Sequence, residues 1–101
     1  MLFIFSIYDS AASYYQPPFA CNNKGIALRE FSDACNNKET FLAKHPADYT
    51  LFLLGTFDDI TGEFVLEKTP IRLGTAIEFV KVDPVVREKS LGLDDQGCSV
   101  N

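Results

Sequence analysis

One group of side chains in this sequence combines aromatic rings with positive charges: Tyr14, Tyr15, Phe19, Lys24, Arg29, Lys38 and Lys44. Proteins bind single-stranded nucleic acid by stacking bases on aromatic rings beside cations that contact the phosphates. The alternative is that the rings belong to the core and the charges are only solvated. We expect Phe19 to pack beside a helix and the two tyrosines to stay exposed, which makes this group the candidate nucleic-acid-binding site.

A second group is acidic and lies between two apolar segments: Asp58, Asp59, Thr61 and Glu63. A calcium loop of the EF-hand type needs carboxylates at alternate positions and a closing glutamate, and this segment does not have that pattern. Short acidic turns between strands usually accept hydrogen bonds from their own backbone. We therefore predict a turn here, and the sequence indicates neither a metal nor a cofactor.

His45 is the only histidine, so a Ser-His-Asp or Cys-His mechanism would have to use it. No neighbouring residue marks a serine or cysteine as an activated nucleophile. Cys21, Cys35 and Cys98 form no CxxC pair and do not have zinc-finger spacing, which fits reduced thiols in a cytoplasm. We expect His45 to lie on a surface loop and the protein not to be an enzyme.

Length and charge restrict the kind of protein that this chain can be. Its 101 residues predict a single domain over residues 1–80, followed by a charged tail over residues 81–101. The formal charge of −5 is the reverse of the basic balance of proteins that coat nucleic acid, so any such contact must be local. The apolar N-terminal segment is far shorter than the roughly 20 residues of a membrane-spanning helix, and we expect no membrane contact.

The first half of the chain predicts a strand and a helix. Residues 2–8 are apolar on both alternating faces, which is typical of a central strand. Residues 9–23 lose this periodicity and contain Pro17-Pro18, so they are interpreted as a loop. After Asn22 or Asn23 as the N-cap, apolar residues recur at helical spacing and predict a helix over residues 24–36. A further short helical turn is expected over residues 40–44.

The second half is organised around a β-hairpin, with arms over residues 49–57 and 63–67 and a turn over residues 58–62. Gly62 can take the positive φ at which the chain re-enters the ladder. Thr69-Pro70 is expected to break the second arm before a short edge strand over residues 71–73. Residues 76–80 predict a short helix with Thr75 as its cap.

These elements predict an α+β fold, with a small antiparallel sheet in β-α-β-β-β-α order and one main helix on one face. Either Leu51 and Leu53, or Phe52 and Leu54, are left on the other face, depending on the register of the hairpin. One helix cannot cover both faces of a sheet, so we predict a homodimer in which two sheets, or exchanged C-terminal segments, meet.

Several phrases of the sequence together carry a family resemblance. They are Ser6-Ile7-Tyr8-Asp9, Pro17-Pro18-Phe19, Phe31-Ser32-Asp33-Ala34-Cys35-Asn36, the segment from Pro46 to Gly62, and Ala76-Ile77-Glu78-Phe79. The chain resembles, over about residues 2–80, the small nonstructural protein of gokushovirus-type microviruses, which are small phages with single-stranded circular DNA. The extension after Val80 and the acidic balance depart from the family pattern.

The resemblance implies a phage protein of the bacterial host cytoplasm that is not part of the mature virion and is associated with genome replication. We therefore expect a non-catalytic protein that binds single-stranded DNA during genome replication or packaging. The alternative is an adaptor that contacts the phage initiator or host replication proteins without binding DNA, a role that needs no basic surface. The family offers no catalytic residues to carry over to this chain.

Overall fold

The computed structural model describes residues 1–81, whose strands form one antiparallel sheet. The elements in chain order are β1 (Leu2–Asp9), β2 (Tyr14–Tyr15), β3 (Phe19–Cys21), α1 (Lys24–Cys35), α2 (Phe41–Lys44), the 3₁₀ helix η1 (Pro46–Asp48), β4 (Tyr49–Asp58), β5 (Glu63–Thr75) and the 3₁₀ helix η2 (Ala76–Glu78). The predicted α+β class and the single main helix are confirmed. The predicted tail lies outside the described residues, apart from Lys81.

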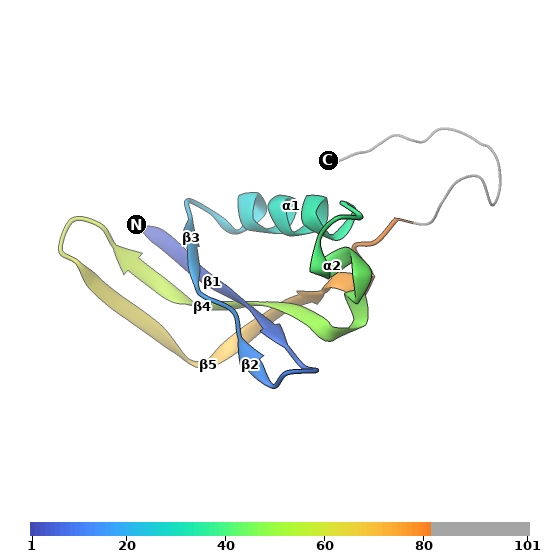
Figure 1. The fold of residues 1–101 in the computed structure, drawn as a ribbon. Coiled ribbons are helices and arrows are strands. Elements are labelled where there is room, and N and C mark those ends of the chain that lie inside the picture. The colour runs from blue at the N-terminus through green and yellow to red at the C-terminus, as the bar shows by residue number, and fades with distance from the viewer. Residues whose placement is uncertain (82–101) are drawn as a thin grey trace.

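The sheet has the order β2-β1-β4-β5, and β3 pairs with β1 on the same side as β2. β1 therefore lies inside the sheet, as its two apolar faces predicted. In Figure 1, α1 runs across one face of the sheet, and the tip of the β4–β5 hairpin extends past the end of α1. None of the helices in residues 1–81 is long and apolar enough to cross a membrane.

The core lies between the sheet and the helices. Ala27, Phe31 and Cys35 recur at every fourth position of α1 and are all buried, so they form the stripe that meets the sheet. Phe5, Leu51 and Leu53 supply the buried sheet side, and Leu42 of α2 and Ala76 of η2 complete the cluster. The register therefore places Leu51 and Leu53 in the core and Phe52 on the opposite face.

The predicted cap of α1 and the predicted hairpin turn agree with the structure, whereas Thr75, the predicted cap of the last helix, makes no side-chain capping hydrogen bond at η2. The side chain of Asn23 accepts a hydrogen bond from the Ile26 amide at 2.8 Å and so caps α1. The hydroxyl of Thr40 does the same for α2 through the Ala43 amide at 3.2 Å. Gly62 has a φ of 81°, the left-handed conformation that the hairpin turn requires.

Three sequence expectations were wrong in detail. The expected loop over residues 9–23 contains β2 and β3. These strands are too short to show periodicity in the sequence, and they form by pairing with the second edge of β1. Pro70 does not end a strand, because β5 continues over it at the edge of the sheet, where a missing donor is tolerated. The expected helix over residues 76–80 is the shorter η2.

An irregularity in the hairpin accommodates Pro70. Leu53 pairs with Ile71 and Gly55 pairs with Leu66, so residues 67–70 of β5 lie opposite Leu54 alone. The strand bulges there, and its backbone does not need a regular ladder at the proline.

Candidate functional site on the open face of the sheet

The sheet face opposite α1 carries a group of aromatic and polar side chains, of which Tyr15 and Arg72 are exposed, and we call it the open face. Side chains of directly paired residues point to the same face of a sheet. Because Phe5 is in the core, its neighbours Ser6 and Ile4 point to the open face, and so does Tyr8.

One row of hydroxyl-bearing side chains crosses the open face. Tyr15 of β2 pairs with Tyr8 of β1, Tyr8 pairs with Thr50 of β4, and Thr50 pairs with Thr75 of β5. The two threonine hydroxyls lie 3.0 Å apart and share a hydrogen bond. The row therefore presents two phenol rings at one side of the sheet and a hydroxyl pair at the other.

The neighbouring row ends in a cation. Ser6 pairs with Phe52, and Phe52 pairs with Arg72. The Ser6 hydroxyl is buried and donates to the carbonyl oxygen of Gln16 at 2.6 Å, so it is already satisfied. Phe52 and Arg72 are the members of this row that a ligand could contact.

Three rings from these rows form what we call the aromatic cluster: Tyr8, Tyr15 and Phe52. Ring centroids are 4.8 Å apart for Tyr8 and Tyr15, 5.8 Å for Tyr15 and Phe52, and 6.4 Å for Tyr8 and Phe52. All three contacts are tilted or edge-on, and Tyr15 remains 42% exposed. A cluster with this geometry fixes its rings by mutual packing and leaves one of them open to a planar ligand.

Arg72 lies beside the aromatic cluster and is held by two acceptors. Its Nη2 atom donates to Thr75 Oγ1 at 3.1 Å and forms an ion pair with Glu78 Oε2. Both charged side chains are about half exposed, so water competes for this pair. The open face thus combines planar rings, hydroxyl groups and a guanidinium within two adjacent rows.

The three aromatic residues expected from the sequence lie in different environments. Tyr15 belongs to the aromatic cluster, whereas Tyr14 pairs with Asp9 and so points to the helix side of the sheet. Phe19 is partly buried and stacks on Phe5, with ring centroids 5.7 Å apart. The expected exposure of both tyrosines is confirmed, but their adjacent positions in a strand place them on opposite faces.

Tyr14 has acidic surroundings. Asp9 lies between Tyr14 and Tyr49 in the ladder, and the pKa of Tyr49 is raised above its usual value by burial first and then by the charges of Asp9 and Asp48. A phosphate would be repelled here, so Tyr14 is a poor candidate for contact with nucleic acid.

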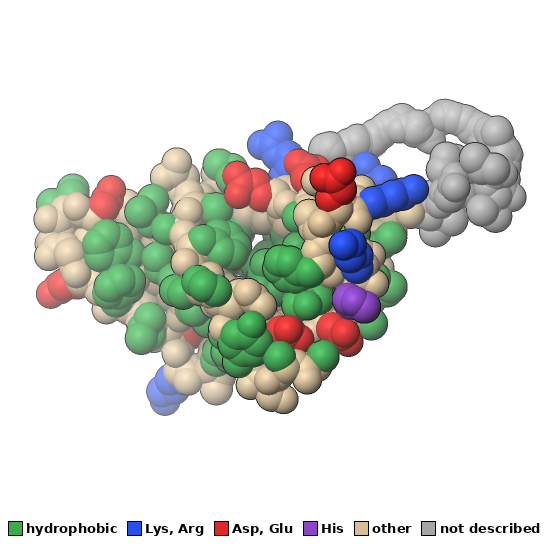
Figure 2. Space-filling model, viewed as in Figure 1, with side chains coloured by type: hydrophobic (Ala, Val, Ile, Leu, Met, Phe, Trp, Pro, Cys, Tyr) green, Lys and Arg blue, Asp and Glu red, His purple; other side chains and the backbone are tan. Residues whose placement is uncertain are grey.

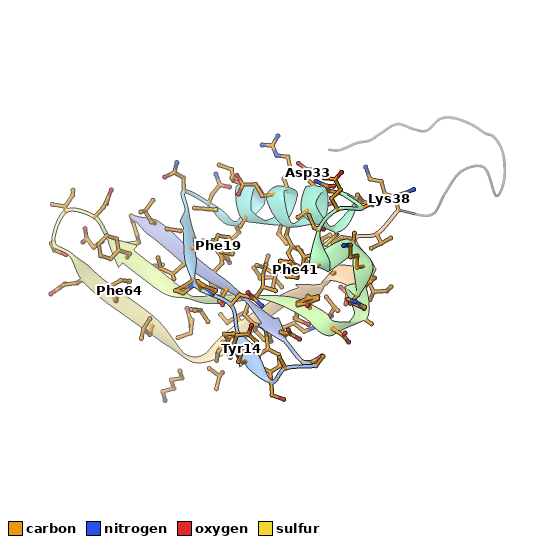
Figure 3. All side chains as sticks on the ribbon, in the orientation of Figure 1. Tyr14, Phe19, Asp33, Lys38, Phe41 and Phe64 are labelled. Carbon is orange, nitrogen blue, oxygen red and sulfur yellow. The ribbon has the colours of Figure 1, made fainter. Side chains whose placement is uncertain are left out.

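The expected basic residues all lie on the helical side of the protein. Lys24, Arg29, Lys38 and Lys44 are exposed on or just after α1 and α2. Figure 2 shows that acidic side chains are mixed with the basic ones over the helical end, so the basic side chains form no continuous track there. In Figure 3, Lys38 lies at the end of α1, far from Tyr14 beside β2. The structure thus separates these cations from the open face.

The sequence did not reveal Tyr8, Phe52 and Arg72 as site residues. Tyr8 and Phe52 were assigned only to strands, and the face of Phe52 depended on a hairpin register that alternation alone left open. The ladder of β1 and β4 resolves the register by pairing Ser6 with Phe52. The signal that could have identified Tyr8 and Phe52 is their alternation with core residues along predicted strands, because it places aromatic rings on the face opposite the core.

The other groups considered from the sequence lie in the hairpin turn, at the end of α2 and in the core. Asp58 Oδ1 accepts hydrogen bonds from the amides of Ile60 at 2.9 Å and Thr61 at 3.3 Å, which is the predicted turn. His45 is exposed at the end of α2, as expected. Burial raises the pKa of the Cys35 thiol to about 11, so it is a protonated core residue at neutral pH.

Comparison with curated proteins and with solved structures found no match. A protein-family model described as Phage ORF5 protein matches residues 2–79, which includes every strand and helix of the described fold. This match identifies a phage protein and specifies no ligand. The chain belongs to the Phage ORF5 protein family.

Proposed function

We propose that this phage protein binds single-stranded DNA on the open face of its sheet and performs no catalysis. The observation that carries the proposal is the aromatic cluster of Tyr8, Tyr15 and Phe52 on a sheet face that no described helix covers. Unpaired bases stack on such rings in several families of sheet-based binding proteins, with little dependence on sequence.

The charges of the open face suit a local contact. Arg72 lies next to Phe52 in the ladder and can reach a phosphate beside a stacked base. The net charge of −5 gives no long-range attraction to DNA, so stacking must supply most of the affinity. We expect a shallow salt dependence, because few phosphates are neutralised.

The biological setting is also part of the proposal. The phrases shared with gokushovirus-type nonstructural proteins support a microvirus with a single-stranded genome, and replication or packaging of that genome exposes single strands. The protein would then act in the bacterial host cytoplasm and be absent from the mature virion. Fractionation of infected cells and purified virions with an antibody against the protein tests this placement.

Fluorescence polarisation with a labelled oligothymidylate, at low and at moderate salt, tests the binding directly. Replacing Tyr15 by Ala should cost about 1 to 3 kcal/mol of affinity if one base stacks on this ring. Tyr14→Ala is the matched control, because it removes the same side chain from the adjacent position on the opposite face. Absence of binding by the unmodified protein at low salt would end the proposal, and equal losses from both variants would remove the open face as the site.

A second candidate function is an adaptor for replication proteins of the phage or host. The observation that favours it is the apolar arm of the hairpin, where Phe64, Val65 and Leu66 are all exposed. Exposed apolar side chains in consecutive positions commonly mark protein contacts. Recovery of replication proteins with the tagged protein should survive nuclease treatment if it is an adaptor, and should be lost if DNA forms the link.

Homodimerisation remains a proposal of the same kind. A second copy of the chain could cover the apolar arm and the edge of β5 that pairs with no described strand. Sedimentation equilibrium checks this directly, and a monomer at high micromolar concentration would refute it.

A further inference from the structure

We infer that Glu78 occupies the place of a DNA phosphate on Arg72, so that the ligand must displace this carboxylate in order to bind. The inference rests on the proposed function of the open face. It assigns Arg72 as the residue of that face that contacts a phosphate, and Glu78 as the carboxylate that competes with the phosphate for Arg72.

The arrangement of Arg72 supports this assignment. Its pairing with Phe52 places its side chain on the open face beside the aromatic cluster. The row of Ser6, Phe52 and Arg72 is adjacent to the row that contains the two tyrosines. The only hydrogen bonds of its guanidinium to described residues are those of Nη2 to Thr75 and Glu78. A guanidinium has five N–H donors in a planar fork, which matches two oxygens of a phosphate as well as it matches a carboxylate.

The partners of Arg72 differ in what they would do when a phosphate arrives. Thr75 is neutral, is fixed by its hydrogen bond to Thr50, and can stay in place as an acceptor for Arg72. Glu78 is charged, about half exposed, and placed at the end of η2, so its side chain can turn to water. Exposed ion pairs contribute little to stability, so a phosphate can replace the carboxylate at small cost.

The exchange has a consequence for salt dependence. When a phosphate binds a free arginine, a counterion leaves the DNA, and affinity falls as salt rises. When it must first release Glu78, the freed carboxylate attracts a cation in turn, and the net release of ions is smaller. Glu78 should therefore lower the affinity and also flatten its dependence on salt.

Polarisation titrations of labelled oligothymidylate test the inference with Glu78→Gln, which removes the charge and keeps the size of the side chain. We expect about a two- to five-fold gain in affinity, and a salt slope that is steeper by up to about one. Glu63→Gln is the matched control, because it makes the same change of net charge on an exposed residue at the opposite end of β5. It should raise affinity less and leave the slope unchanged.

The Arg72→Gln background makes the test specific. If Glu78 acts through Arg72, then in the Arg72→Gln background Glu78→Gln should raise affinity no more than Glu63→Gln does. An equal gain from Glu78→Gln in both backgrounds, or equal effects of Glu78→Gln and Glu63→Gln, would overturn the inference while leaving the proposed function intact. Failure of the unmodified protein to bind at low salt would instead end the proposed function.

Discussion

The side-chain amide of Asn36 joins the end of α1 to Phe79, which lies 43 positions later in the chain. Its Nδ2 atom donates to the carbonyl oxygen of Phe79 at 2.9 Å and to that of Ser32 at 2.8 Å. Its Oδ1 atom accepts a hydrogen bond from the Lys81 amide at 2.8 Å. One side chain thus fixes the segment after η2 against the helix, and the Phe79 ring packs edge-on against Phe31, with centroids 5.4 Å apart.

We predict that Asn36→Ala destabilises the protein by about 1 to 3 kcal/mol, because partly buried backbone groups lose their partners. Urea unfolding followed by circular dichroism measures the change. Asn37→Ala is the control, since within residues 1–81 the Asn37 side chain accepts only one hydrogen bond, an exposed one from the Glu39 amide. Similar losses in the two variants would show that the contacts of Asn36 to Phe79 and Lys81 add nothing to stability.

A second prediction concerns Gly55, where the strands of the hairpin approach closely. A Cβ atom at this position would lie 2.3 Å from the carbonyl oxygen of Val65 and 2.8 Å from the Cα atom of Leu66. Both atoms belong to the backbone of β5, so relief requires the strands to separate. Gly55→Ala should therefore lower the free energy of unfolding by about 1 to 3 kcal/mol.

The control for Gly55→Ala is Gly25→Ala in the first turn of α1. The nearest atom to a Cβ there is the side-chain oxygen of Asn23 at 3.3 Å, which can move slightly. Alanine favours a helix by about 0.5 to 1 kcal/mol over glycine, so the net change should be small. A larger loss from Gly25→Ala than from Gly55→Ala would contradict the steric explanation.

Local patterns predicted the hairpin and α1 because each has its own chemical signal. Asn23 is a polar cap before an apolar helical stripe, and Asp58 and Gly62 supply the residue types that a hairpin turn requires. β2 and β3 were missed because strands of two and three residues show no alternation and depend on β1 as a template. The sequence predicts a break at Pro70 because the position of this proline at a sheet edge, beside a bulge, is a property of the tertiary structure.

The candidate site was harder to predict than the fold, because it depends on which face each strand residue takes. Tyr14 and Tyr15 were grouped by proximity in sequence, and their pairing with β1 separates them. Tyr15 instead joins Phe52, which lies 37 positions later, through ladders whose register is set by the burial of Phe5, Leu51 and Leu53. The site is therefore a consequence of core packing on the other side of the sheet.

Phe19 provides a prediction that separates packing from binding. Its ring stacks on the fully buried ring of Phe5, so Phe19→Ala should destabilise the fold by up to about 3 kcal/mol, at the low end for phenylalanine because Phe19 is only partly buried. Thermal unfolding measures this loss. DNA affinity, measured well below the unfolding transition, should be unchanged, whereas a loss of affinity with normal stability would return Phe19 to the binding site.

The last prediction concerns pH and the turn at Asp58. The backbone amide of Ile60, followed by that of Thr61, donates to this carboxylate, and these bonds lower the pKa of Asp58 from its usual value. A carboxylate whose pKa is lower in the folded state than in the unfolded state stabilises the fold at pH values above its pKa in the unfolded state. This stabilisation is lost as the pH falls through the folded pKa, because both states then bind the proton.

Asp58→Asn keeps an oxygen acceptor for the turn but removes the charge. We expect it to be less stable than the unmodified protein at neutral pH, with a difference that shrinks as the solution is acidified below about pH 4. Urea midpoints at a series of pH values measure this convergence. Asp33→Asn is the control, because the Asp33 carboxylate is exposed on α1 and accepts no hydrogen bond from described residues, so its effect should vary little with pH. A constant difference between Asp58→Asn and the unmodified protein across this range would mean that the charge of Asp58 does not strengthen the turn.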